Sequence, residues 1–202
     1  NYKEIKKNFL SKYNFNSNGD TEVLLKFLHC YKEKALKKIE GMFAFALWDE
    51  KKQELFAARD PFGIKPFYFY YHKNIFYFAS EIKAFKFAGL KLEPNYKKIN
   101  EFLRWGVLDY DNNTWFNNIY SLEPGHYIKL KKNRITINRF YYLPSEVKEK
   151  KELNLNLAKK KFRNLISKSV KNHSRSDRNV GVHLSGGVDS SVISAVAAKV
   201  SN

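Results

Sequence analysis

An aromatic-rich stretch in the first half of the chain constrains the fold most. It reads GMFAFALWDEKKQELFAARDPFGIKPFYFYYHKNIFYFASE, from Gly41 to Glu81. Aromatic residues favour strands, and the polar and glycine-containing breaks between them are typical of turns. The strands are apolar on both faces, so we expect further layers to cover each side of the sheet. The pattern predicts strands at Met42–Trp48, Glu54–Ala58, Pro66–Tyr71 and Ile75–Ala79.

Helical patterns flank this stretch. Before it, GDTEVLLKFLHCYKEKALKKI places apolar residues at helical spacing after Asp20, which we expect to be the helix N-cap. Cys30 lies inside this helix and is predicted to be a packed or half-buried thiol rather than a reactive one. After the stretch, short helices are expected at about Glu81–Lys86 and Tyr96–Trp105. SLEPGHYIKLKKNRITINRFYYL then predicts two more strands, preceded by a Glu-Pro-Gly turn.

The C-terminal quarter has a different pattern. PSEVKEKKELNLN, at 144–156, is polar and charged and is interpreted as a linker. An amphipathic helix is predicted to begin at Leu157. NVGVHL then predicts a buried strand, followed by the Ser-Gly-Gly loop and a helix in DSSVISAVAAKV. This is the opening of an α/β nucleotide-binding domain, and because one strand cannot form a sheet we expect the domain to be incomplete in this sequence.

The loop in GVHLSGGVDSSVISAVAAKV is either a tight turn or a cradle for phosphates. A glycine-rich turn that opens a helix exposes free backbone N–H groups at the positive end of the helix dipole. Gly186 and Gly187 let the backbone approach a phosphate closely, and Asp189 can hold the Mg²⁺ that accompanies ATP. No Lys follows the second glycine, and G-x-G-x-x-G is absent. The hydroxyls that can add donors belong to Ser185, Ser190 and Ser191.

Composition narrows the class of protein. The 202 residues carry a net charge of +17, and the stretch from Lys129 to Arg178 holds 16 Lys and Arg against 4 Asp and Glu. A basic stretch raises nucleic acid as a partner, but this one lacks interleaved aromatic residues and any known binding motif, so we do not expect it. The sequence shows neither a membrane-spanning apolar run nor a secretory core. The single Cys30 fits a reducing, cytoplasmic location.

The string S-G-G-V-D-S-S resembles the pyrophosphate-binding loop of ATP pyrophosphatases, which split ATP into AMP and pyrophosphate. Upstream, GMFAFALWDEKKQELFAARDPFGIKPFYF and FASEIKA resemble the glutaminase domain of glutamine-hydrolysing asparagine synthetases. GDTE is similar to that family's S-D-T-E segment, and LEPGHYI to its L-x-P-G-H-x-x turn. The resemblance covers the whole chain in the family's order and spacing.

The resemblance implies a fold and a division of the chain. Residues 1–143 would form an N-terminal-nucleophile hydrolase-type αββα sandwich, the α+β part of the fold, with its N-terminal part missing. Residues 144–156 would be a linker. Residues 157–202 would contribute the first strand, loop and helix of an adenine-nucleotide α-hydrolase-like α/β domain, the ATP-pyrophosphatase half of an asparagine synthetase.

The resemblance also implies site residues. Asp20 matches the Asp that binds the α-ammonium of glutamine. The loop residues matching the pyrophosphate-binding positions are Ser185, Gly186, Gly187, Asp189, Ser190 and Ser191, with Asp189 as the Mg²⁺ ligand. His183 stands where the family places an apolar residue against adenine, and we keep it as a nucleotide contact. Arg59 and Asp60, in the R-D-x-x-G-x-x-P segment, are expected to pair and fix a turn, as are Glu81 and Lys83.

The catalytic nucleophile is not among these residues. In the family a Cys at position one attacks glutamine, whereas this sequence has Asn1 there, and Cys30 lies within a helix. The resemblance therefore implies that the chain is an internal fragment, without catalytic residues and inactive alone.

The parent enzyme would use MgATP to adenylate the side-chain carboxylate of aspartate, and ammonia from glutamine would displace AMP. Small-molecule partners are thus ATP, glutamine and aspartate, and a homodimer of the parent stays open. Family relatives that amidate another acceptor, or close a β-lactam ring, are the alternative. A basic nucleic-acid-binding protein is a more distant one.

Overall fold

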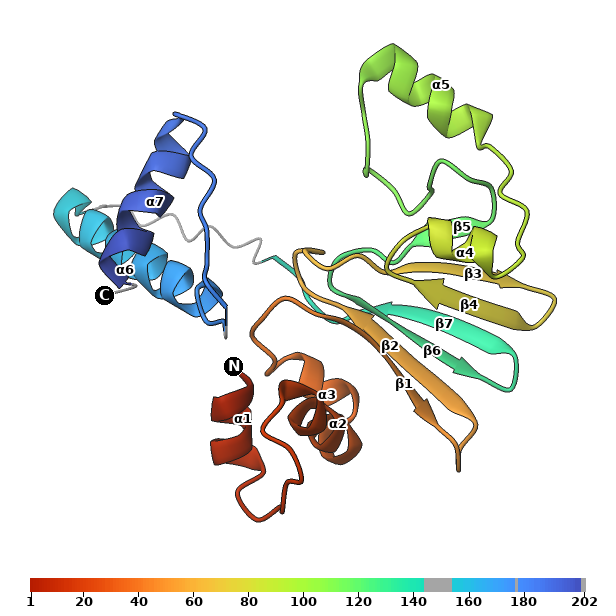
Figure 1. The fold of residues 1–202 in the computed structure, drawn as a ribbon, viewed down its shortest axis with the longest axis horizontal. Coiled ribbons are helices and arrows are strands. Elements are labelled where there is room, and N and C mark those ends of the chain that lie inside the picture. The colour runs from red at the N-terminus through yellow and green to blue at the C-terminus, as the bar shows by residue number, and fades with distance from the viewer. Residues whose placement is uncertain (144–153, 177, 201–202) are drawn as a thin grey trace. The chain divides into compact units, whose positions relative to one another are not determined.

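The computed structural model describes residues 1–143, 154–176 and 178–200. The chain forms two compact units, Asn1–Leu143 and Pro144–Asn202 (Figure 1).

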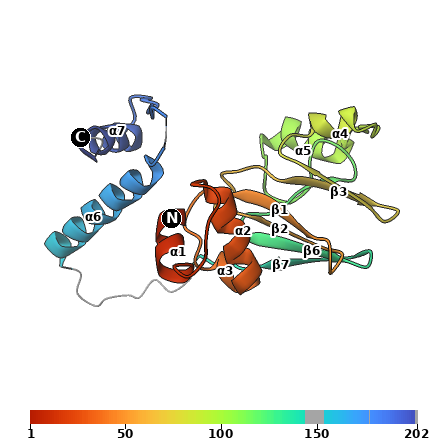
Figure 2. The ribbon, with the colours of Figure 1, turned by 60° about the horizontal axis from the view of Figure 1, so that its bottom comes forward.

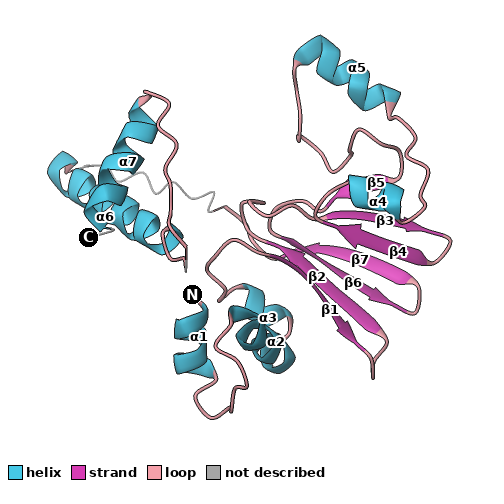
Figure 3. Cartoon of the chain, viewed as in Figure 1, coloured by secondary structure: helices cyan, strands magenta, loops and turns pink. Residues whose placement is uncertain are grey.

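Two antiparallel sheets make up the centre of the first unit (Figure 3). One sheet has the strand order β1-β2-β6-β7, and the other has the order β4-β3-β5. The first sheet consists of two hairpins, β1-β2 and β6-β7, and the second consists of the hairpin β3-β4 with β5 added beside β3. The strands are β1 (Ala44–Asp49), β2 (Glu54–Arg59), β3 (Tyr68–His72), β4 (Ile75–Ala79), β5 (Ile119–Ser121), β6 (His126–Lys131) and β7 (Arg134–Arg139).

The side chains of β2 explain why the sheets stack between helices. Successive residues of a strand point to opposite faces. Phe56 and Ala58 join a buried cluster with residues of the N-terminal helices, such as Phe27. Ala57, which points the other way, joins a cluster with Phe69 of the second sheet. The strand β2 is therefore buried on both faces, as its apolar pattern predicts.

Helices form the outer layers of this sandwich. Against the four-stranded sheet lie α1 (Tyr2–Phe9), α2 (Asp20–Tyr31) and α3 (Glu33–Leu36). Beside the other sheet, α4 (Lys83–Phe87) contacts β4, and α5 (Tyr96–Trp105) follows it in the chain. Figure 2 shows α2 and α3 on one side of the stacked sheets and α4 on the other. The order of layers is the αββα arrangement expected from the resemblance.

Several local expectations differ from the structure. The first and third predicted strands begin two residues late, at Ala44 and Tyr68. The helix α1 and the three-residue strand β5 were not predicted, and the predicted helical stretch after Asp20 is divided at Lys32 into α2 and α3. Cys30 was expected to be packed or half-buried, but it is exposed, with its Sγ 3.1 Å from the hydroxyl of Tyr13. It lies on the solvent side of α2, because Val23 and Phe27 take up the buried face.

The second unit contains α6 (Leu155–His173) and α7 (Val188–Val200), which pack against each other. The side chain of Asn154 caps α6 by accepting a hydrogen bond from Leu157 N, at 3.1 Å, so the helix begins two residues before the predicted start. Residues 144–153 of the predicted linker lie outside the described residues.

The prediction of a strand at 179–184 is wrong, because the structure has no strand there. Val182 and Leu184, which the prediction buried, are 43% and 66% exposed. A strand needs a neighbour to satisfy its backbone N–H and C=O groups, and the described part of this unit supplies none.

The longest helix in the described ranges is α6, with 19 residues, and it carries the three consecutive lysines of its first turns. None of the helices described combines the length and the apolar character that crossing a membrane requires.

Candidate functional site

Asp20 is the first residue of α2, and its carboxylate is exposed. The N-cap is Gly19, and no side chain caps the helix, so the expected capping role of Asp20 is wrong. A carboxylate at the first helical position sits one residue too late to receive the N–H groups that an N-cap side chain receives. Among the described residues, the Asp20 carboxylate accepts a hydrogen bond from Thr21 Oγ1, at 3.3 Å. This leaves the Asp20 carboxylate available to a ligand.

Asp60 and Arg59 fix the turn after β2, but not by pairing with each other. Asp60 is fully buried, and its carboxylate accepts backbone N–H groups of three residues: Phe62 and Ile64 at Oδ1 (3.0 and 3.1 Å), and Lys65 at Oδ2 (3.0 Å). An ionised carboxylate held this way is satisfied without a cation. The expectation of an Arg59–Asp60 pair is therefore corrected, because each side chain is occupied by backbone.

Arg59 bonds the other side of the same turn. Its guanidinium donates to the carbonyl oxygens of Gly63 (2.8 Å), Lys65 (2.8 Å) and Leu122 (2.6 Å), and to Ser121 Oγ (3.0 Å). These bonds join the turn to the end of β5 and leave the side chain little capacity for a ligand. The second expected pair is present, since Lys83 Nζ lies 2.5 Å from Glu81 Oε2, with both side chains exposed.

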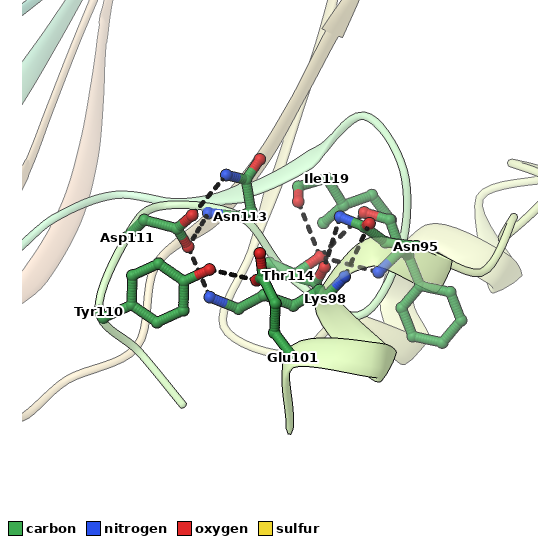
Figure 4. Close-up of polar contacts among 9 residues, drawn as sticks. Asn95, Lys98, Glu101, Tyr110, Asp111, Asn113, Thr114 and Ile119 are labelled. Carbon is green, nitrogen blue, oxygen red and sulfur yellow. Dashed lines mark hydrogen bonds and ion pairs between the residues drawn. The ribbon is translucent and has the colours of Figure 1, made fainter. Parts of the chain in front are cut away.

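A cavity of about 640 Å³ opens beside this turn, and none of the residues predicted to bind glutamine, nucleotide or Mg²⁺ lines it. Its wall includes Tyr110 and Asp111, which a buried lysine holds in place (Figure 4). Lys98, only 4% exposed, places Nζ 2.6 Å from Asp111 Oδ1 and 3.6 Å from the centroid of the Tyr110 ring. The other residues that line the cavity are Arg59, Pro61, Phe62, Gly63, Tyr68, Asp109, Ser121, Glu123, Pro124, Arg139, Tyr141 and Leu143.

The ionisation of this wall follows from its hydrogen bonds. Tyr110 donates its hydroxyl to Glu101, and this bond raises the pKa of Tyr110 to about 12. For Asp111, burial raises the pKa, but hydrogen bonds from Lys98 and Asn113 outweigh it and leave the pKa below its usual value. The charges of Lys98 and Asp111 thus pair with each other, and this ion pair holds α5 to the loop that follows it.

The Ser-Gly-Gly loop stands at the N-terminal end of α7. Ser185 Oγ lies 3.0 Å from Ser190 Oγ, and Ser190 Oγ in turn accepts the N–H of Ser185 at 3.3 Å. The hydroxyls of Ser190 and Ser191 both contact the carbonyl of Gly187, at 3.0 and 2.8 Å. Gly186 has a φ of +83°, in the region that favours glycine. The three serines are thereby gathered around the two glycines.

Asp189 lies in the first turn of α7, with Gly187, Ser185 and the other loop residues exposed or half-buried around it. No cluster of three or more potential metal ligands occurs in the part of the chain that the structure describes. Mg²⁺ does not require one, because it is commonly held by one or two carboxylates, substrate phosphates and water. The single Asp189 fits this way of holding Mg²⁺. His183 is exposed in the preceding segment, and no contact with the loop is recorded for it within the described residues.

Comparison with known proteins follows this division of the chain. Residues 1–142 match the glutamine amidotransferase domain family, and residues 161–202 match the asparagine synthase family. Asparagine synthetase [glutamine-hydrolyzing] 1 of Bacillus subtilis is 36% identical over 98% of this chain and 31% of its own length. Amidase chry2 of Gibberella zeae is 32% identical over 96% of this chain and 29% of its own length. The chain thus spans about a third of the length of these relatives.

Solved structures resemble the fold. A glutamine phosphoribosylpyrophosphate amidotransferase from Bacillus subtilis aligns with a TM-score of 0.50 and 17% identity, covering 98% of this chain and 42% of that one. An allosteric regulatory enzyme of purine biosynthesis aligns with a TM-score of 0.51 and 20% identity, covering 71% and 27%. The fold is that of the N-terminal-nucleophile glutamine amidotransferases. The match over residues 1–142 shows that the chain belongs to the glutamine amidotransferase domain family, and the match over residues 161–202 adds a similarity to the asparagine synthase family.

Proposed function

We propose that this chain is part of a longer glutamine-dependent asparagine synthetase, in which residues 1–143 bind glutamine and residues 157–202 begin the ATP-binding half, joined by a linker at 144–156. The observation that carries the proposal is the Ser185–Ser191 loop at the start of α7, in a chain whose first 142 residues match the glutamine amidotransferase family. One half supplies ammonia, and the other activates the acceptor that ammonia attacks. A cytoplasmic location is proposed with it, from the single Cys30.

The proposed reaction has two bond exchanges in the synthetase half. A side-chain carboxylate oxygen of aspartate attacks the α-phosphorus of ATP, and pyrophosphate leaves. Ammonia then attacks the acyl carbon of the aspartyl adenylate, and AMP leaves with the oxygen that came from aspartate. Adenylation is needed because a carboxylate oxygen is a poor leaving group, whereas AMP is a good one.

The loop's part in this reaction is to hold the pyrophosphate as its charge develops. The first N–H groups of α7 have no carbonyl partner within the helix and lie at the positive end of its dipole. The hydroxyls of Ser190 and Ser191 now contact Gly187 O, and each can turn toward a phosphate oxygen instead. Asp189 would bind the Mg²⁺ that neutralises the pyrophosphate.

The glutamine half is proposed to hold its substrate through Asp20. The carboxylate is exposed, and among the residues that the structure describes it accepts only the weak bond from Thr21, so it can pair with the α-ammonium of glutamine.

A different acceptor is the second candidate, and the similarity to amidase chry2 favours it, because that relative is named for another activity. The sequence elements described would serve any carboxylate acceptor equally. The acceptor is chosen by residues that bind it, and the Ser185–Ser191 loop contacts only phosphates in this proposal.

The test uses the full-length protein with MgATP, glutamine and aspartate labelled with ¹⁸O in its side-chain carboxylate. We expect AMP, pyrophosphate, glutamate and asparagine, with one ¹⁸O atom in the AMP. Formation of ADP and phosphate would overturn the adenylation step. AMP formed only with another carboxylic acid would favour the second candidate.

A further inference from the structure

Glu22 makes the densest set of contacts in the loop before α2. Its carboxylate accepts the N–H of Asn16 at both oxygens, each at 3.1 Å. Oε2 also accepts the N–H of Ser17, at 2.7 Å, and its hydroxyl, at 2.8 Å. A Glu at the third helical position commonly reaches back to the N-cap. Here it reaches further, to residues two and three positions before Gly19.

Lys26, one turn along α2, completes the same arrangement. Its Nζ lies 2.8 Å from Glu22 Oε1 and also donates to the carbonyl of Asn14. The ammonium stands 4.4 Å from the centroid of the Phe15 ring, and that of Lys6 stands 4.2 Å from it. The loop from Asn14 to Ser17 is therefore bound to α2 through its backbone and its one aromatic side chain.

These contacts define where Asp20 lies. Only Asn18 and Gly19 separate the clamped Ser17 from Asp20, so fixing Ser17 restricts the entry of the chain into the helix. Glu22 accepts the N–H groups of Asn16 and Ser17, whereas within the described ranges Asp20 accepts only the bond from Thr21. The Glu22 carboxylate thus accepts several hydrogen bonds from the protein, whereas the Asp20 carboxylate can still accept hydrogen bonds from a ligand.

We propose that Glu22 is a positioning residue for glutamine, holding the Asn14–Gly19 loop so that the Asp20 carboxylate, with its one weak bond from Thr21 among the described residues, is presented to the substrate's α-ammonium. This inference rests on the proposed function, because it assumes that Asp20 binds glutamine. Glu22 is not itself a ligand, since its side chain is only 17% exposed and both oxygens already accept several hydrogen bonds.

The charge state supports this role. The hydrogen bond from Lys26, followed by those from Asn16 and Ser17, lowers the pKa of Glu22 to about 2. Glu22 is therefore ionised at the pH values at which a glutamine amidotransferase would be assayed. Removing it leaves the loop free to move, and ligand binding must then bear the cost of ordering the loop.

A double-mutant cycle in the full-length protein tests the proposal, with glutamate release as the assay. Asp20→Asn and Glu22→Ala should each raise the KM for glutamine, Glu22→Ala by about tenfold with kcat within about twofold. In the Asp20→Asn background, Glu22→Ala should add little further, because its effect is transmitted through Asp20. Glu22→Gln, which keeps an acceptor but loses the ion pair, should give a smaller rise. Glu93→Ala, which removes an exposed carboxylate paired with Lys91, is the matched control.

The outcomes separate the two claims. An unchanged glutamine KM in Asp20→Asn overturns the assignment of Asp20, and with it the proposed glutamine site. If Asp20→Asn raises KM but Glu22→Ala has its full effect in both backgrounds, the positioning role is wrong. It is also wrong if Glu22→Ala and Glu22→Gln lower the thermal midpoint and leave KM unchanged.

Discussion

Two turns in this chain each contain a glycine and an aspartate, and they differ in how their polar groups are bonded. In the Arg59–Lys65 turn, the buried Asp60 accepts three backbone N–H groups, and Arg59 donates to three carbonyls. In the Ser185–Ser191 loop, Asp189 stands at a helix start with no such role and is exposed to solvent. A turn that satisfies itself has a structural role, whereas one that leaves N–H groups open is suited to a ligand. The predictions below test that contrast.

The largest effect is expected at Asp60. Asp60→Ala removes a buried acceptor of three part-buried backbone N–H groups, and should lower the free energy of unfolding by about 3 kcal/mol. Urea unfolding of the purified chain, followed by tryptophan fluorescence, measures this. Asp49→Ala, at a partly exposed carboxylate in the last residue of β1, is the control and should cost much less. Equal losses in the two variants would contradict a structural role for the Arg59–Lys65 turn.

Asp189 should show the opposite behaviour. In the full-length protein, Asp189→Ala should reduce aspartate-dependent pyrophosphate release by ~10²-fold or more, because the pyrophosphate charge loses its Mg²⁺. Glutamate release should stay largely intact. The two products are measured side by side, with Lys199→Ala, near the far end of α7, as control. If the loop is only a turn, the variant instead loses ~1 kcal/mol of stability and pyrophosphate release survives.

A pair of glycines separates backbone strain from crowding. Gly63 and Gly106 have nearly the same positive φ, +64° and +65°. A Cβ on Gly63 would stand 2.8 Å from Pro124 Cγ and 3.2 Å from the Arg59 guanidinium, whereas one on Gly106 meets nothing within 4 Å. Gly106→Ala should cost about 1 kcal/mol of stability, and Gly63→Ala at least about 1 kcal/mol more. If Gly63→Ala and Gly106→Ala lower the free energy of urea unfolding equally, the turn around Arg59 can move to accommodate the added Cβ at little cost.

Local pattern was enough to predict most of the first unit. The strands β2 and β4 and the helix α5 were predicted within a residue at each end, because aromatic alternation and helical spacing are local signals. The strand at 179–184 was predicted by the same kind of signal and is not formed, because a strand depends on a neighbour that no local pattern contains. The short β5 and the four-residue α3 are stabilised by packing rather than by their own sequence.

The candidate sites were predictable to a different degree. Residue types located Asp20 and the loop at Ser185–Ser191, but not the partners of their side chains. Asp20 was expected to cap α2, and a shift of one residue in the helix start removes that role. Arg59 and Asp60 were identified as turn-fixing residues, yet adjacency in sequence suggested an ion pair where the structure has bonds to backbone. Glu22 was missed, although a Glu three residues after Gly19 is a known helix-start signal.

The smallest effect concerns Glu22 and pH, and it extends the contrast to a carboxylate that is mostly, but not fully, buried. Its pKa is lowered from 4.5 to about 2 by Lys26, Asn16 and Ser17, so folding favours the ionised form. The stabilising contribution is therefore fully present above pH 4.5 and is lost as the pH falls through 2. The difference in unfolding free energy between the natural chain and Glu22→Gln should be constant from pH 7 down to about 5 and shrink below that. A difference that stays constant to pH 2 would mean that the clamp on the Asn14–Gly19 loop acts through its shape rather than through its charge.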